Sequence, residues 1–261
     1  MDTVTIRGVT LGAGTPKIIV PIVDATQEGI LNKAREITSL PVDMVEWRVD
    51  FYQDVLSFDK LLETLGKLRA ALGELPIMFT LRTGHDGGEL DVSFEQYKAV
   101  NEAAAASGCA DLIDVEIYHG AEALRDHIDA IHGAGARVIG SFHDFRGTPS
   151  REEMVARLRQ AQDMGSDISK IAVMPQRQED VLALLDASVE MKEKYATRPI
   201  LTISMGPMGM VSRVACETTG YCMTFGAVCK TSAPGQIQAA ELRHTLDMLH
   251  KAQFGADKSV A

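Results

Sequence analysis

The sequence is short of cysteine and of metal-binding patterns, and each shortage excludes a class of site. The four cysteines form no C-x-x-C pair, and their spacing matches no zinc template; they are Cys109, Cys216, Cys222 and Cys229. We interpret them as reduced, mostly buried thiols. The seven histidines show no H-x-x-x-H spacing on a helix. The sequence therefore predicts no metal site.

The chain also lacks any run of about 18 apolar residues, which excludes a membrane-spanning helix. Its first residues lack the apolar stretch of a secretory signal, so we expect a cytoplasmic protein. With 26 basic and 36 acidic residues, the formal net charge is −10, without blocks of one sign. An acidic surface repels nucleic acid and anionic membranes. An anionic substrate would therefore need a local cluster of Arg and Lys.

Apolar runs of strand length alternate with helical patterns from one end of the chain to the other. Each run is rich in Val, Ile or Leu, as expected of a strand covered on both faces. The predicted strands are Lys17–Val23, Asp43–Val49, Pro76–Arg82, Asp111–Ile117, Arg137–Phe142, Ile168–Met174, Pro199–Met205 and Met223–Val228.

Helix-start and helix-stop residues bound the segments between these runs. Ser57 and Ser93 are good N-cap residues, and Ser150 with Glu153 forms a capping-box pattern. The predicted helices are Thr26–Ser39, Phe58–Leu72, Phe94–Ser107, Ala121–His132, Ser150–Met164, Gln178–Tyr195, a short piece near Gly209–Thr219, and Gly235–Lys251.

Eight strand–helix units in about 230 residues are the number needed for a closed barrel. We therefore predict an α/β fold, a single-domain (β/α)8 TIM barrel over residues 1–261. The main alternative, a doubly wound open sheet, usually has a Gly-rich turn after its first strand, whereas this strand leads into PIVDATQEG. Residues 1–16 predict a hairpin that closes the barrel floor, and residues 252–261 a frayed tail.

Charged side chains at the ends of the predicted strands are the most informative residues. Buried parallel strands should be apolar, and the active sites of such barrels lie at the carboxyl ends of the strands. Six of the eight runs carry a charged or titratable residue there, namely Glu46 and Arg48, Arg82, Glu116, His143 and Asp144, Lys170, and Lys230. Six such groups at one rim favour a functional site, because each unpaired buried charge costs several kcal/mol.

Lys170 stands out because it lies early in an otherwise apolar strand. Burial disfavours the ammonium, and a neutral amine is a nucleophile toward a ketone or aldehyde. Periodicity alone does not distinguish between two interpretations of Lys170: a nucleophile, or a lysine whose side chain extends to solvent. His143 closes the neighbouring strand and could act as a base near neutral pH. This neighbour favours the nucleophile, and thus a lyase that forms an imine.

At these residues the sequence resembles the type I 3-dehydroquinate dehydratase (3-dehydroquinase) family. The resemblance covers roughly residues 1–250. Four stretches carry it: Glu46-Trp47-Arg48-Val49-Asp50, Ser141-Phe142-His143-Asp144-Phe145, Lys170-Ile171-Ala172-Val173-Met174-Pro175 and Ser232-Ala233-Pro234-Gly235-Gln236.

The resemblance implies a barrel enzyme without metal or organic cofactor, and a homodimer. It implies that Lys170 forms a Schiff base with the C3 ketone of 3-dehydroquinate. It implies that His143 removes a proton from C2 and protonates the departing C1 hydroxyl, giving 3-dehydroshikimate, in the shikimate pathway. Arg213 matches the carboxylate-binding arginine. The remaining matches are substrate-binding positions. Glu46, Arg48 and Arg82 match residues that bind the ring hydroxyls. Ser232 and Gln236 match positions on the eighth loop, which folds over the substrate.

The sequence departs from the family pattern at two positions. Asp86 stands where the family usually has a Glu that orients the catalytic His, and it is one methylene shorter. We expect it to reach His143 after a backbone shift or through water. Pro21 stands at a position that is often Ser, so one minor substrate contact is lost. The Gly- and Pro-rich segment 204–209 predicts that the loop before Arg213 is positioned differently.

Two other functions fit parts of the pattern. A class I aldolase also forms an imine, but Arg213 and Gln236 argue against a simple sugar aldehyde. A non-catalytic binding protein on the same scaffold would need neither Lys170 nor His143. Dehydration of 3-dehydroquinate is common to aromatic biosynthesis and to quinate breakdown, so the sequence leaves these two roles open.

Overall fold

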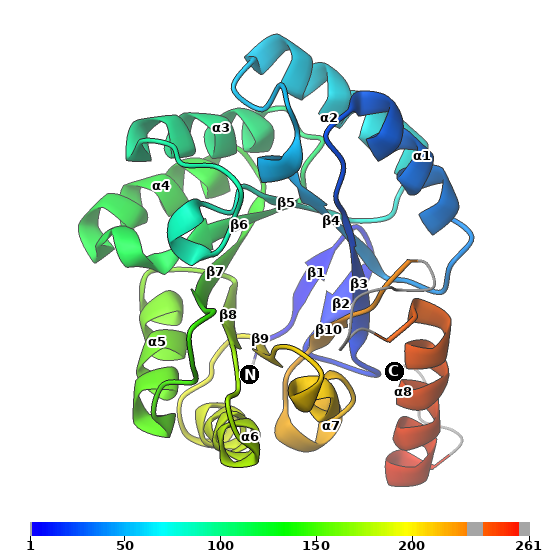
Figure 1. The fold of residues 1–261 in the computed structure, drawn as a ribbon, viewed down its shortest axis with the longest axis vertical. Coiled ribbons are helices and arrows are strands. Elements are labelled where there is room, and N and C mark those ends of the chain that lie inside the picture. Colours follow the sequence, from blue (N-terminus) through cyan, green and yellow to red (C-terminus); the bar gives the residue numbers. More distant parts are fainter. Residues whose placement is uncertain (1, 229–236, 256–261) are drawn as a thin grey trace.

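Eight parallel strands form a barrel with the helices arranged around it (Figure 1). The computed structural model describes residues 2–228 and 237–255. Each strand pairs in parallel with its neighbour in the sheet. In sheet order the strands are β10 (Met223–Phe225), β3 (Lys17–Ile22), β4 (Met44–Arg48), β5 (Ile77–Thr80), β6 (Leu112–Glu116), β7 (Arg137–Asp144), β8 (Ile168–Val173) and β9 (Ile200–Ser204).

Cys222 joins the two ends of this sheet. Its backbone N–H donates to the Ile200 carbonyl at the start of β9 (2.9 Å), and its carbonyl accepts from the Lys17 N–H (3.0 Å). The next residue, Met223, is then in register with Lys17 on β3. The sheet is therefore curved into a nearly closed barrel, which confirms the predicted TIM-barrel fold and excludes the open doubly wound sheet.

The helices cover the outside of the barrel, and several begin where the sequence predicts a cap. The Thr26 hydroxyl accepts from the Gly29 N–H (3.1 Å), and Ser93 forms a complete capping box with Gln96. The helices are α1 (Gln27–Ile37), α2 (Phe58–Leu72), α3 (Phe94–Ala106), α4 (Ala121–Gly133), α5 (Arg151–Asp163), α6 (Gln178–Lys194), α7 (Cys216–Thr219) and α8 (Ala239–Phe254). Among residues 2–228 and 237–255, no helix has the length and apolarity needed to cross a membrane.

Ser57 is the N-cap residue of α2, as predicted, but its side chain makes no capping hydrogen bond. Two other local predictions are wrong. The helix predicted near residues 209–219 is split into the 3-10 turn η4 (Met208–Arg213) and the short α7, because the Gly- and Pro-rich stretch before it favours turns. The frayed tail predicted from residue 252 begins too early, since α8 continues to Phe254.

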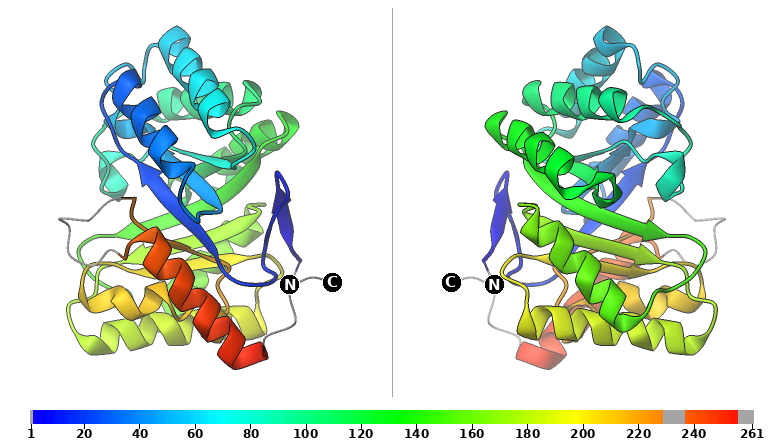
Figure 2. Two further views of the ribbon diagram at one scale, coloured as in Figure 1. Left: turned by 90° about the vertical axis from the view of Figure 1, so that its right-hand side faces the viewer. Right: turned by 90° about the vertical axis from the view of Figure 1, so that its left-hand side faces the viewer.

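The N-terminal hairpin consists of β1 (Val4–Ile6) and β2 (Val9–Leu11), which pair antiparallel. Arg7 and Gly8 make its turn with positive φ angles of 44° and 80°. Figure 2 shows the hairpin at the end of the barrel where β3 begins. Leu11 is completely buried against the lowest interior side chains of the strands. The hairpin therefore closes the floor of the barrel, as predicted.

The inside of the barrel changes from apolar to charged along the strands. Side chains two residues apart on a strand point to the same face. Five strands contribute buried apolar residues to the lower layer: Met44, Met78, Leu112, Ile139 and Ile168. Two residues further along, the same strands carry Glu46, Thr80, Asp114, Ser141 and Lys170, all buried. The strand period thus places a polar layer directly above an apolar one.

Candidate active site

Lys170 lies on β8 in the polar layer, and only 4% of it is exposed. Its Nζ donates to Asp114 Oδ2 (2.9 Å) on β6 and lies 3.9 Å from Glu46 Oε1 on β4. It also lies 5.4 Å above the centre of the Phe225 ring. The side chain therefore points into the barrel, which excludes the reading in which it extends to solvent. Its surroundings also correct the picture of a lone amine in an apolar strand, because two carboxylates face it.

Asp114 is the centre of a buried ionic network. Arg82 lies 2.8 Å from Asp114 and 2.9 Å from Glu116, and the Ser141 hydroxyl donates to Asp114 (2.5 Å). Burial alone would raise the pKa of Asp114, but the cations Arg82 and Lys170 outweigh it and hold that pKa well below its usual range. Asp114 is therefore ionised at neutral pH, and it fixes Lys170 without being able to accept its proton.

Sequence reasoning missed Asp114, although a signal was present. Asp114 and Glu116 lie two residues apart on one strand, the same spacing as Glu46 and Arg48 on β4. A strand run was expected over residues 111–117, and only Glu116 was noted as a charge within it. A second charge at the same spacing places both side chains on the inner face.

His143 lies on β7, one same-face step beyond Ser141, which pairs in register with Lys170. Burial and the nearby cations Arg82 and Lys170 lower the pKa of His143 well below its ordinary value. The imidazole is therefore neutral at physiological pH. A neutral imidazole beside a lysine can accept a proton.

Asp86 comes close enough to contact His143. Its Oδ2 lies 3.4 Å from His143 Nδ1, at the long limit of a hydrogen bond. Asp86 belongs to the 3-10 turn η2 (Gly84–Asp86), and Gly87 follows it with a φ of 81°. A Cβ on Gly88 would lie 1.9 Å from the Arg82 carbonyl oxygen, so this turn requires glycine there. The tight turn brings the short side chain up to the imidazole.

An ionised carboxylate accepts hydrogen bonds but cannot donate them. In the contact with ionised Asp86, the His143 Nδ1 is therefore the protonated nitrogen of the neutral ring. The other nitrogen, Nε2, is then the free base. Burial and the neighbouring Glu116 raise the pKa of Asp86, whereas a hydrogen bond from His85 lowers it. The protonation state of Asp86 thus depends on its neighbours: burial and Glu116 favour the neutral carboxyl, and His85 favours the carboxylate.

A cavity of about 320 Å³ opens above this layer. It is lined by residues that the sequence singles out at four strands, β4, β5, β7 and β8, together with Arg213 from η4 and Pro21 from β3. Arg48 donates two hydrogen bonds to Asp50 (2.8 and 2.7 Å). By contrast, the buried Nε of Arg213 has no hydrogen-bond partner among the described residues, and burial lowers the pKa of Arg213. A guanidinium at a cavity wall whose buried Nε has no partner among these residues suits an anionic ligand.

Two of the predicted site residues cannot be compared with this geometry. Ser232 and Gln236 lie outside the described residues. All of the others, Glu46, Arg48, Arg82, His143, Lys170 and Arg213, line the one cavity, and Asp86 lies behind His143.

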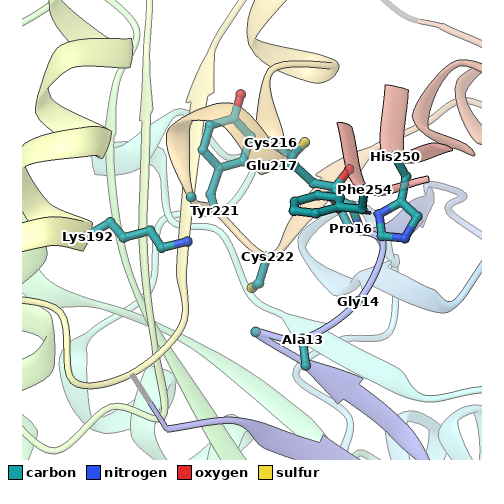
Figure 3. Close-up of a pocket in the computed structure, with 12 residues that line it drawn as sticks. Ala13, Gly14, Pro16, Lys192, Cys216, Glu217, Tyr221, Cys222, His250 and Phe254 are labelled. Carbon is teal, nitrogen blue, oxygen red and sulfur yellow. Dashed lines mark hydrogen bonds and ion pairs between the residues drawn. The ribbon is translucent and has the colours of Figure 1, made fainter. Parts of the chain in front are cut away.

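A second cavity, of about 310 Å³, lies at the opposite end of the barrel. Figure 3 shows Lys192 at one side of it and His250 and Phe254 at the other. His250 is paired with Glu217 (2.6 Å). Burial raises the pKa of both Cys216 and Cys222 to about 12, so these thiols remain protonated and unreactive. Within residues 2–228 and 237–255, no group of three or more His, Cys, Asp or Glu side chains could hold a metal ion.

Comparison with known proteins agrees with this geometry. A family model described as type I 3-dehydroquinase matches residues 18–253. The 3-dehydroquinate dehydratase of Bacillus licheniformis is 46% identical over 95% of this chain and 98% of that protein. The enzyme of the same name from Salmonella agona is also 46% identical, over 97% of this chain and 100% of that protein.

A solved structure shares the fold closely. The type I 3-dehydroquinate dehydratase from Clostridium difficile, with covalently modified comenic acid, superimposes with a TM-score of 0.94. It is 42% identical and covers 96% of this chain and 99% of its own. The crystal structure of 3-hexulose-6-phosphate synthase, at 15% identity and a TM-score of 0.61, shares the barrel fold alone. The chain therefore belongs to the type I 3-dehydroquinase family of hydro-lyase enzymes.

Proposed function

We propose that the protein converts 3-dehydroquinate to 3-dehydroshikimate by syn elimination of water through an imine on Lys170. The observation that carries this proposal is the position of Lys170. Lysine is rarely buried, yet Lys170 lies inside the barrel mouth, held by Asp114 (2.9 Å) and one strand away from a neutral histidine. A buried amine beside a neutral base is the pairing that imine chemistry requires.

The first stage is attack of the Lys170 amine on the C3 ketone. The ammonium must lose a proton, and Asp114 is too acidic to keep it. The neutral His143 imidazole is the nearby acceptor that we assign to this transfer. The carbinolamine then loses its hydroxyl as water, with His143 returning the proton, and leaves a protonated imine.

The second stage is the elimination. His143 Nε2 takes the C2 proton, and the electrons of the C2–H bond move to the iminium nitrogen to give a neutral enamine. The enamine then expels the C1 hydroxyl, which leaves as water with the proton from His143. Hydrolysis of the resulting conjugated imine releases 3-dehydroshikimate and regenerates the Lys170 amine. Positioned base catalysis of this kind contributes about 10²- to 10⁴-fold.

The cavity wall supports a polyhydroxylated carboxylate as substrate. Arg213 has a planar donor fork, and its Nε has no partner among the described residues, which suits the substrate carboxylate. Glu46, Arg48 and Arg82 line the same cavity and are assigned to the ring hydroxyls. Ser232 and Gln236 are assigned to the substrate from the family resemblance alone. The volume of about 320 Å³ accommodates a single six-membered ring with its substituents.

The same resemblance supports three further assignments. We infer that the reaction is the third step of the shikimate pathway, towards aromatic amino acids, that it takes place in the cytoplasm, and that the protein is a homodimer. Sedimentation equilibrium of the full chain tests the dimer, and a purely monomeric protein at micromolar concentration would contradict it.

Borohydride trapping tests substrate, residue and mechanism together. The protein is incubated with 3-dehydroquinate and sodium borohydride, digested, and its peptides are weighed. We expect the Lys170 peptide to carry the reduced adduct, and no adduct when either substrate or borohydride is omitted. An unmodified Lys170 peptide from active protein would falsify the imine assignment.

A further inference from the structure

His85, beside the site but outside the cavity, contacts the carboxylate that faces His143. Its Nδ1 lies 2.7 Å from Asp86 Oδ1, while the other oxygen, Oδ2, faces His143 Nδ1 at 3.4 Å. The Asp86 carboxylate therefore lies between two imidazoles. The exposures differ sharply: 61% of the His85 side chain is exposed, against 2% for Asp86 and 8% for His143.

The His85 ring is held in place by its own contacts. It stacks on the Tyr118 ring with centres 3.8 Å apart and planes inclined by 21°. The Tyr118 hydroxyl bonds the Thr83 hydroxyl (3.1 Å), which in turn donates to Glu116 (2.7 Å). An exposed histidine with such a fixed ring is not a freely rotating surface side chain. Its Nδ1 is consequently presented to Asp86 in one orientation.

A carboxylate needs this support because its terminal torsion is soft. Rotation of the Asp side chain about χ2 is broad, so a single weak contact at 3.4 Å does not fix the plane of the carboxylate. The short bond to Oδ1 removes that freedom. With Oδ1 engaged, Oδ2 is left turned toward His143.

We propose that His85 is a positioning residue, which fixes the Asp86 carboxylate through Oδ1 and thereby orients His143, the base of the reaction. This inference rests on the proposed function for the role of His143, but the His85–Asp86–His143 contacts are independent of any substrate. His85 does not touch the reacting atoms.

The charges around Asp86 give the inference a pH signature. Glu116 and burial raise the pKa of Asp86, while the His85 hydrogen bond and Arg82 lower it. Loss of the His85 bond removes a lowering influence, so the pKa of Asp86 rises further. Asp86 is then protonated at a higher pH, and the neutral carboxyl is a weaker acceptor for His143 than the carboxylate. The acid limb of kcat is therefore expected at higher pH.

The other charged and titratable groups near His85, Asp86 and His143 do not change the direction of this pH shift. His143 is faced by Arg82, Lys170, Arg48 and Asp114, which the substitution leaves in place. On the solvent side, His85 is faced by Tyr118 and by His119 of the 3-10 turn η3 (Ile117–His119). The substitution of His85 therefore alters the pKa of Asp86 only through the His85–Asp86 contact.

His85→Phe tests the proposal because phenylalanine keeps a ring on Tyr118 but has no Nδ1. We expect kcat to fall about tenfold, the loss of roughly one charge-assisted hydrogen bond, and the acid limb of kcat to move to higher pH. His85→Asn retains a donor near the Nδ1 position and should restore most of the rate and the original limb. Wild-type kcat and pH profile in His85→Phe, or equal impairment of both variants, overturns the proposal.

A matched control and a substrate-free readout separate this inference from the proposed reaction. His250→Phe removes an imidazole of α8 that is paired with the carboxylate of Glu217, away from the site, and should leave the pH profile unchanged. The imidazole ¹H–¹⁵N spectrum, with His143 assigned by His143→Gln, should show protonated Nδ1 in wild type and mixed tautomers in His85→Phe. Unchanged His143 signals in His85→Phe overturn the positioning role. Changed signals support it even if borohydride trapping fails in the wild type.

Discussion

Two cavities of nearly equal size lie at opposite ends of the barrel, about 320 Å³ at the carboxyl ends of the strands and about 310 Å³ at the amino ends. Both contain a lysine and a histidine. At the carboxyl end, Lys170 and His143 stand on neighbouring strands beside a buried network in which Asp114 contacts both Lys170 and Arg82. At the amino end, Lys192 and His250 come from helix surfaces.

The difference teaches that residue types and cavity volume do not make a reactive site. The strand-borne Lys170 and His143 are fixed by the sheet and lie out of water, so their interactions are strong, and burial lowers the pKa of His143. At the other end, Lys192 is exposed and keeps its solvation, and His250 is paired with Glu217. The following predictions test this contrast, from the largest expected effect to the smallest.

Exchange of the two lysines for methionine gives the largest contrast. Lys170→Met should lower kcat by at least about 10³-fold, because it removes the nucleophile. Asp114 keeps Arg82 and Ser141 as partners, so the variant should still fold. Lys192→Met at the other cavity should match wild type in steady-state rate. Near-wild-type turnover by Lys170→Met, with an unchanged circular dichroism spectrum, would refute the mechanism.

Arg213→Gln tests whether the mouth of the barrel recognises a carboxylate. Loss of hydrogen bonds to a charged group should raise KM about 10- to 100-fold, while kcat changes less. The variant should be at least as stable as wild type, because it removes a buried Nε that has no partner within residues 2–228 and 237–255. Steady-state kinetics and thermal unfolding measure the two effects. A loss confined to kcat would place Arg213 in the chemistry instead.

The pH profile gives the smallest effect. Burial, Arg82 and Lys170 lower the pKa of His143, and the neutral ring is the active form. The acid limb of kcat/KM should therefore lie below the ordinary histidine value of about 6.5. The folded state binds fewer protons than the unfolded state in this window, so the unfolding free energy falls as pH drops through it. A limb at or above 6.5 would show that His143 is not the group that titrates.

Much of the barrel was predictable because its strands are buried on both faces and read as continuous apolar runs. The strand ends were less so. The fifth run was expected to end at Phe142, but β7 extends to Asp144 and includes His143, since its partner strand β8 continues to pair with it. The eighth run ends at Phe225 rather than Val228, where Gly226 packs closely on Ile18 and Ala239.

The ionic partners of the site were harder to predict than its members. Lys170 and His143 could be selected because each is unusual for its strand. Asp114 required the register of β6 against β7 and β8, which decides that three strands meet around one carboxylate. His85 looked like a loop residue, because stacking on Tyr118 depends on how η2 and η3 lie together. Such pairings are set by tertiary packing and leave no local pattern.

The closed floor limits the directions from which Lys170 can be reached. Leu11 and the apolar layer lie below it, and over the described residues the cavity lies on its other side, at the carboxyl ends of the strands. Imine formation and elimination each release a water, and hydrolysis consumes one. One net water per turnover therefore has to leave by the same end of the barrel as the product.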